Sequence, residues 1–229
     1  MIANIILFVM RKTVFATGEV YHVFNLGVEK RQTFTDKREY DRALLTLDFY
    51  RYGGVSAGLA QVLKLDLEKR AFFFSQLAKR TEKLVDIFGY CLMPNHFHLL
   101  LKQLSEEGIS TFIGNSTNSY TRYFNMKHKR IGHLFQGVFK AARIEKDEQL
   151  IHVLRYIHLN PVVSYVIKET YLEDLPYCSF SEYLGKKEGF CNKELILSHF
   201  SSIDKFKSFT YDQIDYGKRL EVIKHLTFE

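Results

Sequence analysis

The sequence predicts an α+β fold in which helices cover a single, mainly antiparallel sheet, followed by a C-terminal extension. Strand-like and helix-like segments follow one another in the order strand, helix, two strands, helix, strand, helix. Only Met93-Pro94-Asn95 separates the two central strands, and so short a connection requires an antiparallel hairpin. The 229 residues are 46% hydrophobic and 25% charged. This composition is ordinary for a folded domain and excludes a largely disordered chain.

Hydrophobic periodicity and turn residues define the first half of the chain. Residues 19–24 (EVYHVF) alternate and are rich in β-branched and aromatic side chains, so we expect a strand that Asn25-Leu26-Gly27 closes. Apolar residues recur at helical spacing over 35–50, with Asp36 as the expected N-cap. Residues 68–78 predict a further helix after a glycine-containing loop.

The second half begins with the predicted hairpin of strands 84–92 and 96–102. Residues 110–129 predict a helix that Gly132 breaks, and 134–144 predict another strand. A helix then runs from an Asp147 cap to about Asn160, where Pro161 is expected to stop it. Residues 1–184 would form the main domain, and residues 185–229 an extension of unknown role.

Charge and cysteine content suggest a compartment and a class of partner. The 32 Lys and Arg against 26 Asp and Glu leave a net charge of +6, which is compatible with a polyanion without requiring one. The three cysteines show no metal-binding or disulfide spacing. The apolar stretch 2–10 is too short to cross a bilayer and lacks a preceding basic residue. We therefore expect a cytoplasmic protein without a membrane partner.

Two histidines stand out on the second strand of the hairpin. Because side chains alternate along a strand, His96 and His98 project from the same face, about 7 Å apart along the backbone. Two neutral imidazoles placed in this way can hold a divalent ion. The alternative is a pair of histidines on an exposed sheet face.

The predicted helix 147–160 has two distinct stripes. The apolar stripe consists of Leu150, Ile151, Leu154 and Ile157. The opposite stripe consists of Gln149, His152, Tyr156 and Asn160. A phenol beside an amide oxygen that can complete a metal's coordination is a sensible nucleophile arrangement. The alternative is a half-buried tyrosine and an asparagine that ends the helix.

Basic and aromatic residues alternate in the region between these two features. The cations that could contact phosphates are Arg122, Lys127, Lys129, Arg130, Lys140 and Arg143. Tyr123, Phe124 and Phe139 lie among them and could stack on unpaired bases, as in proteins that bind single-stranded nucleic acid. The alternative is that these charges are simply solvated.

Together these features resemble a known family. The segment 94–100 (PNHFHLL) is similar to the HUH motif of single-strand DNA nucleases and transposases, and Tyr156 followed by Asn160 resembles their single-tyrosine motif. The segments 18–25 (GEVYHVFN), 132–137 (GHLFQG) and 155–162 (RYIHLNPV) resemble the REP-associated tyrosine transposases, relatives of small insertion-sequence transposases. The likeness extends from about residue 18 to residue 183.

The resemblance implies the ferredoxin-like architecture of HUH nucleases and a specific chemistry. His96, His98 and Asn160 would be ligands of Mg²⁺ or Mn²⁺, with no small-molecule cofactor, and Tyr156 would be the nucleophile. The protein would cleave and rejoin single-stranded DNA near hairpins through a 5′-phosphotyrosine intermediate. The chain length favours a monomer over a dimer. Leu26 stands where the family carries a basic residue.

Several alternatives remain open at the level of sequence. A hydrolase could activate water at the same histidines with Glu145 or Asp147 as base. A relative could bind structured DNA without cutting it, or the motifs could be coincidental in an unrelated α+β domain. Tyr120 and Tyr123 are rival nucleophiles. Further histidines that could approach the ion are His22, His133, His152 and His158.

Overall fold

The computed structural model describes residues 14–219 and contains one four-stranded antiparallel sheet. Its spatial order is β2-β3-β1-β4. The strands are β1 (Val20–Leu26), β2 (Val85–Met93), β3 (His96–Gln103) and β4 (Lys140–Ile144). Both the antiparallel sheet with covering helices and the predicted hairpin, formed by β2 and β3, are confirmed.

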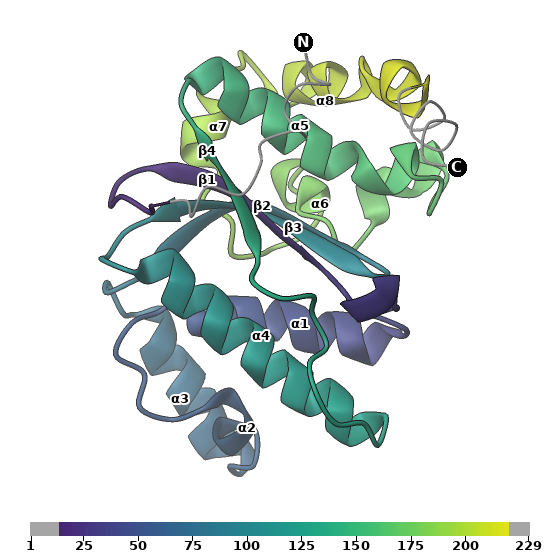
Figure 1. Ribbon diagram of the computed structural model, residues 1–229. Helices are drawn as coiled ribbons and strands as arrows, with labels where there is room; N and C mark the ends of the chain where they lie inside the picture. The colour runs from purple at the N-terminus through teal and green to yellow at the C-terminus, as the bar shows by residue number, and fades with distance from the viewer. Residues whose placement is uncertain (1–13, 220–229) are drawn as a thin grey trace.

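Helices lie on both faces of this sheet (Figure 1). One layer contains α1 (Lys37–Tyr50) and α4 (Gly108–Lys127), and the opposite layer contains α5 (Asp147–Val163). The shorter helices are α2 (Leu59–Val62), α3 (Leu67–Ala78), α6 (Phe180–Tyr183), α7 (Glu194–Leu197) and α8 (Ile203–Tyr211). In the part of the chain that the structure describes, the 3₁₀ helices η2 (Val28–Lys30) and η3 (Glu169–Asp174) lie in connections.

Alternation along the strands divides the apolar core into two parts. Side chains such as Tyr21, Leu99 and Leu101 point toward α1 and α4, and we call this side of the sheet the α1/α4 face. Leu100 and Ile144 point toward α5, on what we call the α5 face. Since residues two apart share a face, the same alternation that buries Leu100 also turns His96 and His98 toward α5.

Gly89 allows α5 to pack closely against the sheet. A Cβ at this position would lie 2.3 Å from Cδ1 of Leu154, so any larger residue would push the helix away. The strand register shifts between Ile87 and Gly89, which places the glycine beneath the helix. A glycine in the edge strand β2 therefore allows α5 to lie close to the sheet.

The start of α1 and both ends of α5 can be compared with the capping and stop residues that the sequence predicted. Asp36 is the N-cap of α1, as predicted, and its side chain accepts a hydrogen bond from the backbone N–H of Glu39. The cap of α5 is Lys146, so Asp147 is the first helical residue rather than the cap. The acidic side chain of Asp147 still favours the positive helix start.

The expectation that Pro161 ends the helix is wrong, because α5 continues to Val163. Proline removes the backbone N–H that would bond to the carbonyl of Ile157, and the last turn closes through the N–H of Ser164, which donates to the carbonyl of Asn160. The carbonyl of Pro161 instead accepts hydrogen bonds from the N–H groups of Val166 and Ile167. The helix therefore terminates just after the proline, which leaves Asn160 inside a regular turn.

The predicted strand 134–144 is also too long, because β4 begins only at Lys140. Gly137 has a φ of 56°, a left-handed value that interrupts an extended chain. Before it, Phe135 makes an isolated bridge to Gly27, and Gln136 donates its N–H to the carbonyl of Leu26. Residues 134–139 are thus a loop fastened to the end of β1.

The segment after residue 184 packs on α5. Ile196, Phe206 and Ile214 are buried in the apolar cluster that contains Leu154 and Ile157. The stretch 2–10 discussed above lies outside the described residues. Within residues 14–219, no helix combines the length and apolar character needed to cross a membrane.

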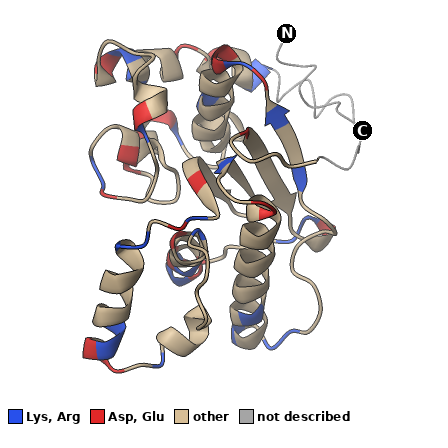
Figure 2. Ribbon diagram, turned by 90° about the vertical axis from the view of Figure 1, so that its left-hand side faces the viewer, with Lys and Arg blue, Asp and Glu red and all other residues tan. Residues whose placement is uncertain are grey.

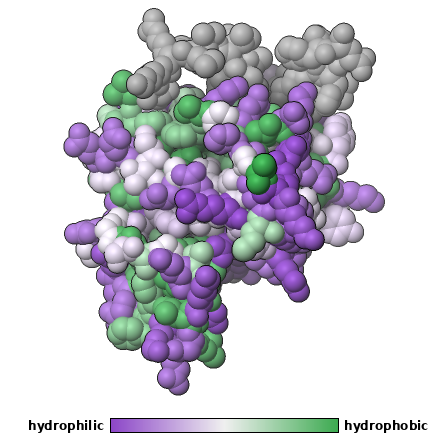
Figure 3. Space-filling view, turned by 60° about the horizontal axis from the view of Figure 1, so that its bottom comes forward, coloured by the Kyte–Doolittle hydropathy of each residue, from purple (hydrophilic) through white to green (hydrophobic). Residues whose placement is uncertain are grey.

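A third, smaller apolar cluster joins α2 and α3 to the end of α1. Phe49, Leu59 and Leu77 are buried in it. Leu67 and Phe72 of α3 are exposed, and the face shown in Figure 3 mixes apolar and polar side chains.

Candidate active site

The residues singled out in the two motifs meet on the α5 face. His96 and His98 extend from β3, His22 extends from the neighbouring β1, and α5 brings Tyr156 and Asn160 over them. The register pairs Phe24 with His98 and Leu26 with His96, so all three histidines share one face. Three segments that are far apart in the sequence thereby form one polar site.

His98 lies at the centre of this site. Its Nδ1 is 3.0 Å from Nε2 of His22, and its Nε2 is 3.3 Å from Nδ2 of Asn160. All three residues are buried, at 6%, 7% and 7% exposure for His98, His22 and Asn160. Burial lowers the pKa of His22 from 6.5 to about 4, so this imidazole is neutral at physiological pH.

His96 is oriented by the residue before it. Nδ1 of His96 is 2.7 Å from Oδ1 of Asn95, whose amide nitrogen donates to the carbonyl of Lys30. Because an amide oxygen only accepts, Nδ1 of His96 is the donor in this contact, which in a neutral ring places the lone pair on Nε2. His96 is therefore held in a tautomer suited to binding a cation.

Tyr156 packs its ring against two of the histidines. Its ring centroid lies 5.5 Å from that of His98 and 5.9 Å from that of His22, both in edge-to-face arrangements. The rival Tyr120 lies on α4 across the sheet, and its hydroxyl donates to the carbonyl of Thr33 at 2.6 Å. Tyr123 lies on the same helix, under the guanidinium of Arg42.

The residues of this site fit a divalent cation. His96 and His98 present imidazoles with ring centroids 4.9 Å apart, and the amide of Asn160 lies beside Nε2 of His98. The amide oxygen, which would be the ligand atom, accepts at present from the hydroxyl of Ser164 at 3.4 Å, so the amide would have to turn. Within residues 14–219, no group of three or more His, Cys, Asp or Glu side chains is arranged to hold a metal. A cation here would therefore need Asn160 or oxygens outside the protein.

The remaining candidate histidines point elsewhere. His158 is fully buried among Phe180, Tyr183 and Phe206, and burial lowers its pKa to about 3. His152 accepts a hydrogen bond from Arg155 and lies near Phe209 of α8. His133 is exposed in the loop before β4.

The carboxylates proposed as general bases are distant from the histidines. Asp147 begins α5, nine residues before Tyr156 and therefore about 13 Å away along the helix axis. The backbone N–H of Glu145, just before it, bonds to the side chain of Gln149. Neither residue is placed to activate a water molecule between His96 and His98.

The basic residues divide between the two sides of the sheet. Lys140 is exposed and pairs with Phe24, which in turn pairs with His98, so its side chain starts from the α5 face. Arg143 starts from the other face and forms an ion pair with Glu19 at 2.9 Å. Basic residues occur along this edge strand in Figure 2.

The other four cations, Arg122, Lys127, Lys129 and Arg130, lie on α4 and the loop after it. Arg122 and Lys129 are exposed, whereas Arg130 donates to the side chain of Asn125. The structure brings none of these four onto the α5 face beside the histidines, where Lys140 lies.

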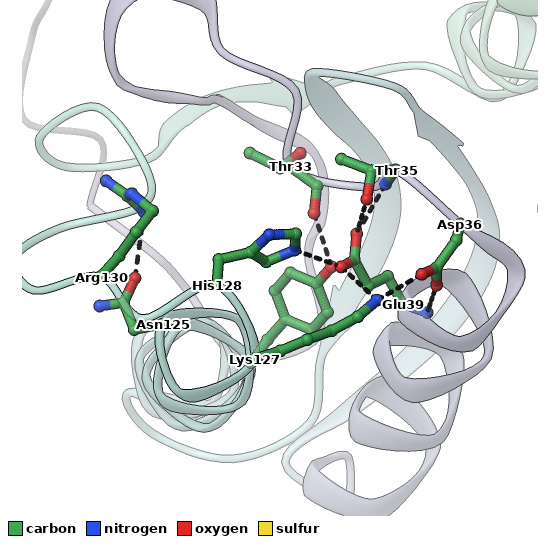
Figure 4. A network of polar contacts seen from close by, with 9 residues as sticks. Thr33, Thr35, Asp36, Glu39, Asn125, Lys127, His128 and Arg130 are labelled. Carbon is green, nitrogen blue, oxygen red and sulfur yellow. Dashed lines mark hydrogen bonds and ion pairs between the residues drawn. The ribbon is translucent and has the colours of Figure 1, made fainter.

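Lys127 belongs to a polar cluster around the buried Glu39 (Figure 4). Lys127 and His128 donate to Oε1 of Glu39 at 2.7 and 2.6 Å, and the N–H and hydroxyl of Thr35 donate to Oε2. Lys127 also pairs with Asp36. Burial would raise the pKa of Glu39, but the bonds from Lys127, His128 and Thr35 outweigh it and hold the pKa below its ordinary value. The cluster ties the start of α1 to the end of α4.

Sequence reasoning did not identify two of the contacts in this site. Asn95 was assigned only to the turn, although an asparagine directly before a histidine pair can orient the first imidazole. The sequence predicted only that His22 could lie near the ion. Its contact with Nδ1 of His98 depends on the pairing of β1 with β3. The alternation of the YHV segment already placed its imidazole opposite the buried Tyr21 and Val23.

Comparisons with known proteins bear on the family and the fold of this chain. The family model of IS200-like transposases matches residues 60–160, which include the histidine pair and α5 up to Asn160. Among solved structures, the chain is similar to a REP-associated tyrosine transposase bound to a REP hairpin. That likeness has a TM-score of 0.53 and 16% sequence identity, covering 77% of this chain and 86% of that chain. No curated protein sequence matches.

The match to the IS200-like family confirms the resemblance to tyrosine transposases that the sequence motifs indicated. The structural likeness confirms the fold.

Proposed function

We propose that this protein is a metal-dependent single-strand DNA endonuclease and strand transferase that acts beside hairpins through its single nucleophile Tyr156. The observation that carries this proposal is the packing of Tyr156 against His98, on the helix that also brings Asn160 to the same imidazole. The match to IS200-like transposases supports the same class of activity. The hairpin bound to the similar solved structure suggests hairpin DNA as the partner.

The proposed reaction is a transesterification at phosphorus. The hydroxyl oxygen of Tyr156 attacks the phosphorus, and the bond from phosphorus to the 3′ oxygen breaks. The phenol proton leaves to solvent, and the departing 3′ oxygen takes up a proton. The 5′ end remains attached to Tyr156, so attack by another 3′-OH reverses the step and joins strands without ATP.

The neighbouring residues would prepare this step. His96, His98 and Asn160 would hold Mg²⁺ or Mn²⁺, which supplies Lewis-acid polarisation of a phosphate oxygen. Asn95 fixes the tautomer of His96. Lys140 offers a cation on the same face for the DNA backbone.

The position of the nucleophile also bears on the alternatives. A water-activating hydrolase would need a carboxylate base, and Asp147 begins the helix about 13 Å from Tyr156 along its axis.

We further propose a cytoplasmic monomer. The free thiols of Cys91, Cys178 and Cys191 suit a reducing compartment.

The test is cleavage of single-stranded hairpin oligonucleotides taken from the DNA that flanks the gene. Wild type, Tyr156→Phe and the control Tyr165→Phe are incubated with Mg²⁺ or Mn²⁺ and analysed on denaturing gels. Tyr165 is a suitable control because it is 63% exposed just beyond the same helix. We expect cutting and a protein-linked strand with wild type and Tyr165→Phe, and neither with Tyr156→Phe.

Two other results would contradict the proposal. Cutting that survives Tyr156→Phe would indicate activated water or another tyrosine. Tight hairpin binding without cutting by any of the three proteins would indicate a DNA-binding protein that has no strand-transfer activity.

A further inference from the structure

His22 is a buried imidazole that directly contacts a proposed metal ligand. It lies on β1, on the same face as His98, and is 7% exposed. Its Nε2 is 3.0 Å from Nδ1 of His98, and the two ring planes are inclined by only 26°. A hydrogen bond between two ring nitrogens needs one proton, which belongs to one ring or the other.

The two arrangements have opposite consequences for His98. If His22 donates, Nδ1 of His98 is the acceptor, and the proton of that neutral ring lies on Nε2, which then cannot bind a cation. If His98 donates from Nδ1, its Nε2 is unprotonated and carries the lone pair. The position of one proton therefore decides whether His98 can be a ligand.

The contact on the other side of His98 selects between them. The amide nitrogen of Asn160 lies 3.3 Å from Nε2 of His98, and an amide NH₂ group can only donate. The oxygen of the same amide accepts from the hydroxyl of Ser164. Both contacts are satisfied together only when Nε2 of His98 is an acceptor, which requires its proton on Nδ1, facing His22.

We propose that His22 is a positioning residue that accepts the Nδ1–H of His98 and thereby keeps Nε2 of His98 unprotonated for a divalent cation. The inference rests on the proposed function and adds the element that orients its central ligand. Metal-binding histidines usually donate their second ring N–H to a fixed acceptor. Asn95 does this for His96, and His22 does it for His98.

The test compares His22→Phe with His22→Gln. Phenylalanine fills the ring's space but offers no acceptor, whereas glutamine retains an oxygen that can accept from Nδ1 of His98. The exposed His199 provides a matched control, His199→Phe. Two quantities are measured in each folded protein: the tautomer of His98 from nitrogen-15 chemical shifts without metal, and the affinity for Mn²⁺.

We expect the wild-type protein to carry the His98 proton on Nδ1. His22→Phe should mix the two tautomers and weaken Mn²⁺ binding 10- to 100-fold, the range for loss of an outer-shell partner. His22→Gln should recover most of that affinity, and His199→Phe should match wild type. Recovery by glutamine separates hydrogen bonding from simple packing of the ring, which contacts Tyr156 as well.

Two results would overturn the inference. One is a wild-type His98 whose proton lies on Nε2. The other is a folded His22→Phe protein that binds Mn²⁺ as tightly as wild type. If instead the wild-type protein binds no Mn²⁺ and cuts no DNA, the proposed function fails, and this inference fails with it.

Discussion

The two faces of the sheet bury polar groups in different ways. On the α1/α4 side, Glu39 is bonded at both carboxylate oxygens, by Lys127 and His128 on one and by Thr35 on the other. On the α5 face, His96 and His98 are bonded through their Nδ1 atoms to Asn95 and His22, which are neutral groups.

This difference separates a structural cluster from the site that we propose binds a metal ion and DNA. The bonds of Glu39 join α1 to α4 within the protein itself. The bonds at Nδ1 of His96 and His98 instead fix the orientation of each imidazole ring. Changes on the first side should therefore alter stability, and changes on the second should alter ligand binding and cleavage.

The largest effect expected from this comparison is on folding stability. Glu39→Ala removes an acceptor of four hydrogen bonds. It should lower the free energy of unfolding by about 3 kcal/mol, since losing one partner of a buried charged network is costly. Urea unfolding measures this change. Cleavage per folded molecule should remain normal, and a loss of cleavage without destabilisation would contradict the structural role.

The same residue predicts a pH dependence of stability. Because the pKa of Glu39 is lowered in the folded protein, its ionised form stabilises the fold above the ordinary pKa of about 4.3. That contribution is lost as the pH falls through the lower folded value. Unfolding measured between about pH 6 and pH 3 should therefore depend less steeply on pH in Glu39→Gln than in wild type.

A smaller effect is expected on the α5 face from Asn95→Ala. This change removes the acceptor for Nδ1 of His96 and should weaken Mn²⁺ binding about tenfold, because the ring loses its fixed orientation. The free energy of unfolding should fall by less than in Glu39→Ala, since the hydrogen bond from the amide of Asn95 to the carbonyl of Lys30 is exposed to solvent. Titration calorimetry with Mn²⁺ checks the prediction, and unchanged affinity would show that Asn95 does not orient His96.

The smallest effect concerns DNA affinity at the edge strand. Lys140→Ala should weaken binding of a single-stranded hairpin oligonucleotide a few-fold and reduce the salt dependence by about 0.7 to 0.9 in log–log slope, the value for one phosphate contact. Arg143→Ala, on the opposite face and paired with Glu19, should change both quantities less. Equal losses in the two variants would contradict the assignment of Lys140 to the DNA-binding face.

The architecture was largely predictable because it depends on local signals. The alternation of β1, the short turn at Pro94 and the helical spacing before Tyr50 each define an element without knowledge of its neighbours. The errors occurred where local signals were overridden. Pro161 lies inside α5, whose last turn closes through the bond from the N–H of Ser164 to the carbonyl of Asn160, and Gly137 adopts a left-handed conformation that shortens β4.

The candidate site was predictable only in part. The spacing of His96 and His98 and of Tyr156 and Asn160 could be read along single elements. The contact of His22 with His98 could not, because it depends on which strands pair and in which register. The placement of Lys140 and Arg143 on opposite faces of the sheet likewise could not be predicted. It depends on how β4 pairs with β1, and the sequence predicted the wrong first residue for β4.

The central claim is that Tyr156, on the α5 face, is the residue that becomes attached to DNA. The most direct measurement traps the protein–DNA adduct, digests it with trypsin and sequences the nucleotide-bearing peptide by mass spectrometry. The proposal predicts the modification on Tyr156 in the peptide 156–168, with fragment ions excluding Tyr165. A nucleotide on peptide 103–122 or 123–127, which carry Tyr120 and Tyr123 from the opposite side of the sheet, would contradict it.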